Sequence, residues 1–326
     1  MNYFLIYRDL AFSRMQLIKF SIPFCFLILC LSIITNISLV EAQIRKNSVV
    51  VTPVSEEMYM FAGKGGNIGV SIGNDGVLLI DSKSKQTIDN IVSSINNISD
   101  NKPIKFVINT HWHHDHVGGN ENLNKNGTMV VAHENVRERM TNKQFVDFLN
   151  REFLPYPENA LPIITYKKNF TLYFNDDRID IHHIPHSHTD GDSIIYFNKN
   201  NIIHTGDIFI NGRYPFIDHS SGGSIGGIIS GIEKIIKISN NDTKIIPGHG
   251  ELTDREKLKD YLVMLNDIVQ QVQKMMLNGN DLDTIIKSNI TSKYDSLYSD
   301  TFINSQDFLG FVFKDLINNK SHPHIS

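Results

Sequence analysis

Apolar and β-branched residues fall in short runs along the first part of the chain, and turn-forming residues separate the runs. Gly-Asn and Asn-Asp-Gly sequences stand between them, and such sequences favour tight turns. The pattern predicts strands at Val49–Val54, Met58–Phe61, Ile68–Ile72 and Val77–Ile80. A helical spacing of apolar residues follows over Lys85–Ile98, and then a buried strand at Ile104–Ile108. The succession of strand, helix and strand predicts a layered αβ unit.

The rest of the chain continues this alternation of strands and helices. Further strands are predicted at Thr128–Ala132, Thr171–Phe174, Arg178–Ile184, Ser193–Phe197, Ile202–His204 and Lys244–Ile246. Helices are predicted at Asn135–Leu149, at Ile225–Ile236 after a capping Ser224, and at Leu258–Val272, with weaker patterns at Leu282–Ile286 and Phe308–Leu316. No internal repeat and no low-complexity linker interrupts the order. We therefore expect one continuous domain.

The N-terminal stretch has a different pattern. Arg8, Arg14 and Lys19 precede an apolar run from Phe20 to Ile34, which is the arrangement of a secretory signal. The run is short for a membrane span, which needs about twenty apolar residues. We expect residues 1–42 to be a signal peptide, with a retained N-terminal anchor as the alternative, and the protein to be secreted or periplasmic.

The pattern of apolar and polar residues along the chain also predicts the domain boundaries. Residues 43–270 are expected to form the main domain, and residues 271–326 a C-terminal helical extension that packs on it. The cleavage site and the true start, at Met1 or Met15, stay open.

Composition narrows the possible chemistry. With 31 Lys and Arg against 35 Asp and Glu, the net charge of −4 gives no basic field, so nucleic acid is not an expected partner. A small-molecule substrate is expected, and the oligomeric state stays open. Both cysteines, Cys25 and Cys30, lie within the predicted leader. The exported protein would then have no disulfide and no thiolate ligand, so histidine and carboxylate side chains must hold any metal.

The candidate chemistry lies directly after the strand Ile104–Ile108, in the sequence His111-Trp-His-His-Asp-His. Its imidazole nitrogens and its carboxylate suit Zn²⁺, with iron or manganese as alternatives. Three further strand ends, with glycine beside two of them, each supply one donor: His188, Asp207 and His249. Such strand ends let the backbone approach a metal closely.

The motif His111-x-His113-x-Asp115-His116, followed by His188, Asp207 and His249, resembles the ligand motifs of the metallo-β-lactamase fold superfamily. The resemblance covers roughly Val49–Leu265 and implies an α/β fold, the four-layer αββα sandwich. It implies one zinc at His111, His113 and His188, a second at Asp115, His116 and His249, and Asp207 between the two. It also implies that a metal-bound hydroxide attacks an ester, thioester, lactone or amide carbonyl, with Asp115 as the catalytic residue that orients it.

The sequence departs from the best-known secreted branch of that superfamily. Many of those β-lactamases have cysteine at the position of Asp207, and a lysine that anchors the drug where Ile210 stands here. Arg213 or Lys168 is the candidate substitute for that anchor. The aspartate resembles the glyoxalase II, lactonase and general hydrolase branches, so a general hydrolase is the leading expectation. A secreted β-lactamase is the first alternative, and a metal-binding accessory protein without turnover is the alternative of another class.

Structural roles are expected for several residues near the candidate ligands. His114 is expected to turn outward to solvent, and His182, His183 and His186 to fill surface or core positions. His204 is expected to be a buried structural histidine. For Asp81, a hydrogen bond to a ligand imidazole and a purely structural role are equally expected. The Gly222-Gly223-Ser224 sequence is expected to cap a helix rather than to cradle an anion.

Overall fold

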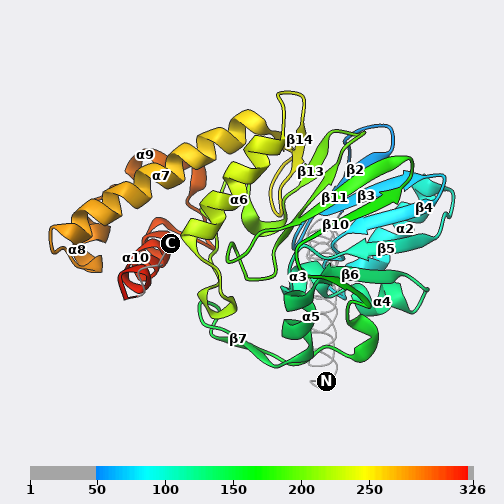
Figure 1. The fold of residues 1–326 in the computed structure, drawn as a ribbon, viewed down its shortest axis with the longest axis horizontal. Helices are drawn as coiled ribbons and strands as arrows, with labels where there is room; N and C mark the ends of the chain where they lie inside the picture. The colour runs from blue at the N-terminus through cyan, green and yellow to red at the C-terminus, as the bar shows by residue number, and fades with distance from the viewer. Residues whose placement is uncertain (1–48, 322–326) are drawn as a thin grey trace, which may run out of the picture. The chain divides into compact units, whose positions relative to one another are not determined.

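Two mixed β-sheets form the centre of the fold in the computed structural model, which describes residues 49–321 (Figure 1). The first sheet has the strand order β1 (Val50–Pro53), β2 (Met58–Ala62), β3 (Ile68–Gly73), β4 (Gly76–Ile80), β5 (Ile104–Ile108), β6 (Met129–His133) and β9 (Ile164–Tyr166). The second has the order β10 (Asn169–Phe174), β11 (Asp177–His183), β12 (Ser193–Phe197), β13 (Ile202–His204), β14 (Lys244–Ile246) and β15 (Thr253–Asp254). The predicted leader and both cysteines lie outside the described residues.

Strand direction brings the functional loops to one edge. In the first sheet β4, β5, β6 and β9 run parallel, and in the second β13 and β14 run parallel. The carboxyl ends of parallel strands lie at the same edge of a sheet, so the segments that follow β4, β5, β13 and β14 emerge close together.

Alternation along the strands builds the layers. On β4, Leu78 and Ile80 face the second sheet and belong to a core that includes Ile181 and Ile195, while Val77 and Leu79 face α2 (Ile88–Ser99). On the far face of the second sheet lie α6 (Ile225–Ile238) and α7 (Arg255–Leu277), which pack on a cluster that includes Ile194, Ile203 and Ile245. Figure 1 shows α6 and α7 on the opposite side of the sheets from α2. The predicted αββα sandwich is therefore confirmed.

The C-terminal helices continue the same outer layer. They are α8 (Leu282–Lys287), α9 (Ser292–Tyr298) and α10 (Ser305–Ser321). Phe308 of α10 is fully buried and stacks on Tyr214 with ring centroids 4.8 Å apart. The described residues form one compact unit. Among them, no helix has the length and apolar character that would let it cross a membrane.

One predicted helix is wrong. The helix expected over Asn135–Leu149 ends early: α5 is Glu134–Thr141, and the chain then forms a hairpin of β7 (Gln144–Val146) and β8 (Arg151–Phe153). Asn150 adopts the left-handed conformation, with φ 45°, at the turn, and Lys143 pairs with Glu152 at 2.5 Å across the hairpin. The apolar residues at 145, 148 and 149 have helical spacing, yet Phe145 pairs with Glu152 in the hairpin, and Phe148 and Leu149 lie in its turn.

The shorter elements are α3 (His114–Val117), α4 (Asn120–Asn124) and three 3-10 turns: η1 (Glu158–Ala160), η2 (Gly206–Ile208) and η3 (His219–Ser221). The expected cap of α6 is confirmed, because Ser224 Oγ accepts a hydrogen bond of 3.0 Å from the Gly227 amide. Asp254 caps α7 in the same way.

Candidate metal centre

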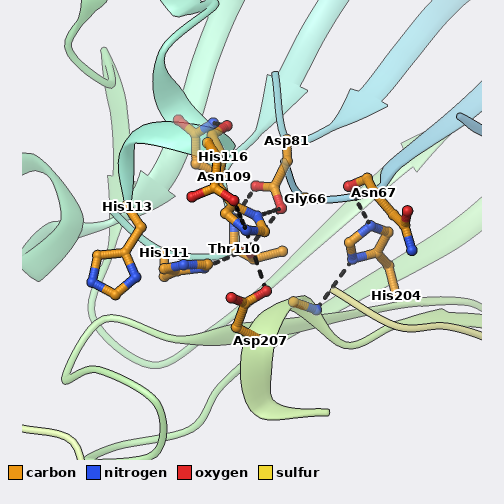
Figure 2. Close-up of polar contacts among 12 residues, drawn as sticks. Gly66, Asn67, Asp81, Asn109, Thr110, His111, His113, His116, His204 and Asp207 are labelled. Carbon is orange, nitrogen blue, oxygen red and sulfur yellow. Dashed lines mark hydrogen bonds and ion pairs between the residues drawn. The ribbon is translucent and has the colours of Figure 1, made fainter. Parts of the chain in front are cut away.

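The structure brings all seven predicted donor residues together at the edge between the sheets. They form three overlapping groups: His111 with His113 and His188, His111 with His116 and Asp207, and Asp115 with His116 and His249. Within each group the donor atoms lie within 4.8 Å of one another. The motif after β5, the loop before β12, η2 after β13 and the turn after β14 supply them. Figure 2 shows the part of this cluster that surrounds Asp207.

Each imidazole of the first group has one ring nitrogen engaged by the protein. His111 Nδ1 lies 3.0 Å from Thr110 Oγ1, and His188 Nδ1 lies 2.8 Å from the carbonyl oxygen of Phe216. His113 Nε2 lies 2.9 Å from Asp218 Oδ2. These contacts fix the orientation of the three rings and turn His111 Nε2, His113 Nδ1 and His188 Nε2 inward, where His113 Nδ1 and His188 Nε2 lie 2.8 Å from each other.

Asp218 is a functional residue that the sequence motifs did not reveal. Its carboxylate is buried and also accepts hydrogen bonds from the Ser220 hydroxyl and the Ser221 amide. Burial opposes ionisation, but the hydrogen bond and the charge of His113 lower the pKa of Asp218. The residue follows no strand and lies far from the histidine motif in the chain, so only the fold places it against His113.

His116 is held in the second group by Asp81. Asp81 Oδ2 lies 2.8 Å from His116 Nδ1, and the same carboxylate accepts hydrogen bonds of 2.8 Å from the Thr110 amide and hydroxyl (Figure 2). Of the two roles expected for Asp81, the structure therefore shows the hydrogen bond to a donor imidazole. His116 Nε2 then faces Asp207 Oδ1 at 3.2 Å.

His249 is positioned through its backbone. The Asn67 side-chain amide donates hydrogen bonds to the carbonyls of Pro247, at 3.0 Å, and Gly250, at 2.8 Å, on either side of the turn that carries His249. His204 is fully buried between the same segments: its Nε2 lies 3.3 Å from the Asn67 carbonyl oxygen, and its Nδ1 accepts from the Gly206 amide at 3.2 Å (Figure 2). The buried position expected for His204 is confirmed, and the imidazole also links two loops of the site.

Two glycines let the backbone approach the donor side chains. A Cβ atom on Gly66 would overlap the ring of His116, and one on Gly248 would overlap Asp207 Oδ1. The carbonyl of Gly66 accepts a hydrogen bond from the buried Lys83 ammonium group. Burial lowers the pKa of Lys83 to about 8, against the opposing charges of Asp115 and Asp81. Lys83 thus ties the Gly66 segment to the strand end that carries Asp81.

The electrostatic environments of the histidines differ. Burial lowers the pKa of His111 well below its usual value and that of His188 to about 4, and neighbouring imidazoles add to the effect. Burial also opposes the charged form of His116, but the carboxylates of Asp207, Asp115 and Asp81 raise its pKa well above the usual value. Asp207 remains ionised, because His249 and His116 hold its pKa well below the usual value despite its burial.

The donor set fits a metal. Seven buried side-chain polar atoms of the described residues have no hydrogen-bond partner, and three of the seven, His111 Nε2, His116 Nε2 and Asp207 Oδ1, belong to one donor group. Buried polar atoms without partners are rare and costly, and a cation between them would satisfy all three. Nitrogen and carboxylate donors of this kind are the ligands of zinc and related metals.

Comparison with known proteins agrees with this geometry. The sequence profile of the metallo-beta-lactamase superfamily matches residues 63–259, more than half of the chain. The chain belongs to the metallo-β-lactamase superfamily. It is therefore a metallo-β-lactamase superfamily hydrolase with histidine and aspartate clusters able to bind metal.

Individual relatives are distant. The metallo-beta-lactamase type 2 of Bacteroides fragilis is 17% identical over 237 residues, which are 70% of this chain and 90% of that protein. The hydroxyacylglutathione hydrolase of Pelagibacter ubique is 31% identical over 105 residues, 32% of this chain and 36% of that protein.

Solved structures show the same fold. A metallo-beta-lactamase from Pontibacter korlensis superposes with a TM-score of 0.55 and 18% identity, covering 68% of this chain and 100% of its own. The DIM-1 metallo-beta-lactamase superposes with a TM-score of 0.55 and 16% identity, covering 67% of this chain and 97% of its own.

A cavity of about 710 Å³ opens onto the superfamily's metal motifs and is lined by His113, Asp115, Asp207 and His249. His114 also lines it, and His114 Nδ1 lies 3.3 Å from the Tyr156 hydroxyl. The expectation that His114 turns outward to solvent is therefore wrong in part: the ring is half-buried at the cavity wall, although it belongs to none of the three donor groups.

The candidate anchors Arg213 and Lys168 have other positions. Arg213 lines the cavity but pairs with Asp300 at 2.9 Å, and Lys168 is not among the lining residues. The other histidines of the region contact protein atoms: His183 stacks on His133 with centroids 3.7 Å apart, and His186 Nδ1 lies 3.1 Å from the Gly222 carbonyl oxygen.

Proposed function

We propose that the protein is an exported, dinuclear zinc-dependent hydrolase that cleaves an ester, thioester, lactone or amide carbonyl. The position of Asp207 carries the dinuclear part of the proposal. Its Oδ1 lies 3.2 Å from His116 Nε2, while its Oδ2 lies 3.7 Å from His188 Nε2 and 3.3 Å from His249 Nε2. One carboxylate thus faces both triads, as a ligand shared by two metals must.

The assignment of ligands follows the two triads. His111, His113 and His188 would hold one ion, Asp115, His116 and His249 the other, and Asp207 both. Two bound zinc ions would supply a water of lowered pKa and polarise the carbonyl oxygen of the substrate. Asp218, Thr110 and Asp81 keep the donor imidazoles in the required tautomer and orientation.

Asp115 is the proposed catalytic residue. Its side chain is the most exposed of the seven, at 37% against 19% for His249, and it lines the cavity. Burial opposes its ionisation, but His116 and His249 lower its pKa. An ionised carboxylate at the cavity floor can accept a hydrogen bond from the attacking water and orient it toward the carbonyl.

Export rests on the leader pattern of residues 1–42. N-terminal sequencing of the protein from the medium, the periplasm and the membranes of the producing cell tests it, because a cleaved leader gives a start near Ala42 and a retained anchor gives Met1 or Met15.

A β-lactamase activity is the second candidate. The metallo-beta-lactamase type 2 of Bacteroides fragilis supports it, because the match covers 90% of that protein. The composition of the site favours a broader hydrolase, because Ile210 stands where many such enzymes have an anchoring lysine.

The deciding experiment measures metal content and activity on the same sample. Zinc-loaded protein is analysed for zinc per chain and assayed with nitrocefin, a thioester, a lactone and an activated ester. We expect two zinc ions per chain and hydrolysis that stops on chelation and returns with zinc. Nitrocefin turnover alone would favour the β-lactamase. Inactivity of the two-zinc protein on every substrate would overturn the hydrolase proposal in favour of a metal-binding accessory protein.

A further inference from the structure

The cavity above the donor cluster has an apolar side. Seven of its lining residues are aliphatic or aromatic and come from outside the metal motifs: Leu149, Phe153, Ile210, Tyr214, Phe216, Phe302 and Ile303. Phe216 stacks on His113 with ring centroids 5.8 Å apart and planes at 19°, and Phe302 contacts Phe216 at 5.9 Å. The apolar side therefore lies next to the triad of His113.

The cavity has a cationic side next to Asp115. Lys64 precedes Gly65, which packs against the Asp115 side chain, and Arg151 lines the same cavity as Asp115. The Arg151 guanidinium lies 4.8 Å from the centroid of the Phe153 ring. Among the described residues, no carboxylate lies within ion-pair distance of Lys64 or Arg151.

The charges of the cavity are unbalanced in favour of an anion. Asp115 and Asp207 are the only carboxylates among the described residues that line it, and both belong to the metal cluster. Arg213 is already neutralised by Asp300. A guanidinium that rests on an aromatic ring and has no ionic partner is suited to bind a carboxylate through two hydrogen bonds. Lys64 is less specific, because it also lines a second cavity.

We propose that Arg151 is the anchor for a carboxylate on the acyl part of the substrate. The preferred substrates are then esters or thioesters of an acyl chain that carries a second carboxylate, with its apolar segment against Phe153, Phe216 and Phe302. The proposal rests on the proposed hydrolase function and deepens it. In the reaction, water adds to the carbonyl carbon, the bond from that carbon to the leaving oxygen or sulfur breaks, and a proton of the water leaves with the alcohol or thiol.

The hairpin β7–β8 and the segment between α9 and α10 supply these contacts, together with Phe216 from the segment between η2 and η3. None of these segments contains a predicted metal ligand, so substrate preference can change without change to the metal centre. Kinetic parameters should separate accordingly: Arg151 should act on KM for charged substrates, because the carboxylate is bound in the ground state as well as in the transition state.

The test uses pairs of 4-nitrophenyl esters with equal carbon number, with and without a terminal carboxylate: butanoate and succinate, pentanoate and glutarate, hexanoate and adipate. In the zinc-loaded wild type, at least one carboxylate ester should exceed its neutral partner in kcat/KM by about tenfold. Arg151→Gln should abolish that preference through KM while it leaves the neutral ester within about twofold. Arg151→Lys should restore part of the preference, and Arg151→Glu should reverse it.

Lys143→Gln is the matched control. Lys143 lies at the start of the same hairpin, pairs with Glu152 and does not line the cavity, so it should not change the preference. For the apolar side, Phe302→Ala should raise KM for the hexanoate ester, whereas Phe145→Ala, an exposed residue of the same hairpin that does not line the cavity, should not.

The outcomes separate the two proposals. Hydrolysis of neutral and charged esters at equal rates, or a preference that survives Arg151→Gln, would overturn the anchor and leave the hydrolase standing. If neither ester is hydrolysed, calorimetric titration of the zinc-loaded protein with adipate and hexanoate decides: tighter adipate binding that Arg151→Gln abolishes supports the anchor, and equal binding overturns it.

Discussion

The two halves of the metal centre differ in how firmly the protein holds them. In the triad of His111, His113 and His188, every imidazole has its second ring nitrogen within hydrogen-bond distance of a protein oxygen. In the triad of Asp115, His116 and His249, only His116 has such a partner among the described residues. In the first triad His111 and His188 are fully buried and only His113 reaches the cavity, whereas in the second both Asp115 and His249 line the cavity and are more exposed than His113.

This difference predicts unequal roles for the two ions. A donor set whose rings are already oriented loses little conformational freedom when it binds metal, so the first triad should hold its ion more tightly. The second triad should exchange its ion more readily and present it to the substrate.

Asp207→Ala should have the largest effect, because Asp207 is the one carboxylate that faces both triads. We expect zinc content to fall below two per chain and kcat/KM to fall by more than about a hundredfold, beyond the loss typical of residues that orient ligands. Asp147→Ala, on the exposed hairpin, is the matched control. It removes a carboxylate outside the donor cluster, so zinc content and folding should not change. Two retained zinc ions with full activity would show that Asp207 is not shared.

Acidification should release the two ions in sequence. A proton competes with the metal for each donor nitrogen. Within the first triad, the pKa of His188 is lowered to about 4 and that of His111 is lowered well below its usual value, so these two imidazoles resist protonation as the pH falls. The pKa of His116 is raised well above the usual value, so protons compete for His116 at a higher pH than for His111 or His188. Zinc content after dialysis at a series of pH values should show two steps, and simultaneous loss of both ions would contradict the comparison.

The two orienting carboxylates provide a sharper test. Asp81→Asn should weaken the second ion and Asp218→Asn the first, each by about 10- to 100-fold in affinity. Competition with a chromogenic chelator measures the two affinities separately. Asp89→Asn, on the exposed face of α2, is the control. If both variants weakened the same ion, the division of the seven donors into two triads would be wrong.

His114→Ala should have the smallest effect. The residue lines the cavity but contacts Tyr156 and joins no donor group, so zinc content should not change and only KM should rise modestly. Loss of an ion from this variant would place His114 among the ligands.

The donor cluster could be predicted from the sequence because its residues lie in short motifs at predicted strand ends. His111, His113, Asp115 and His116 follow one buried strand, and His188, Asp207 and His249 each lie at or near a strand end. The carboxyl ends of parallel strands lie at the same edge of a sheet, so donors at these strand ends are expected to lie close together in one site.

The residues that position the donors could not be predicted in the same way. Asp218, Asn67 and Lys83 act through contacts with segments that are distant in sequence, and none belongs to a pattern with a fixed spacing. The hairpin β7–β8 shows the same limit, since its apolar residues fit a helix and only pairing between Gln144–Val146 and Arg151–Phe153 makes this segment a hairpin. Both the orientation of the ligands and the substrate wall depend on tertiary structure.

The close approach of Gly66 to His116 makes this enzyme vulnerable to a change far smaller than the loss of a ligand. A single methyl group at position 66 would compete with the imidazole for the same space, and Lys83 holds the backbone there so that it cannot easily retreat. A protein with Gly66→Ala would keep all seven donors, the same net charge and the same family motifs. A search of the sequence for ligand residues would therefore not detect the change, although the added methyl group would displace the His116 imidazole.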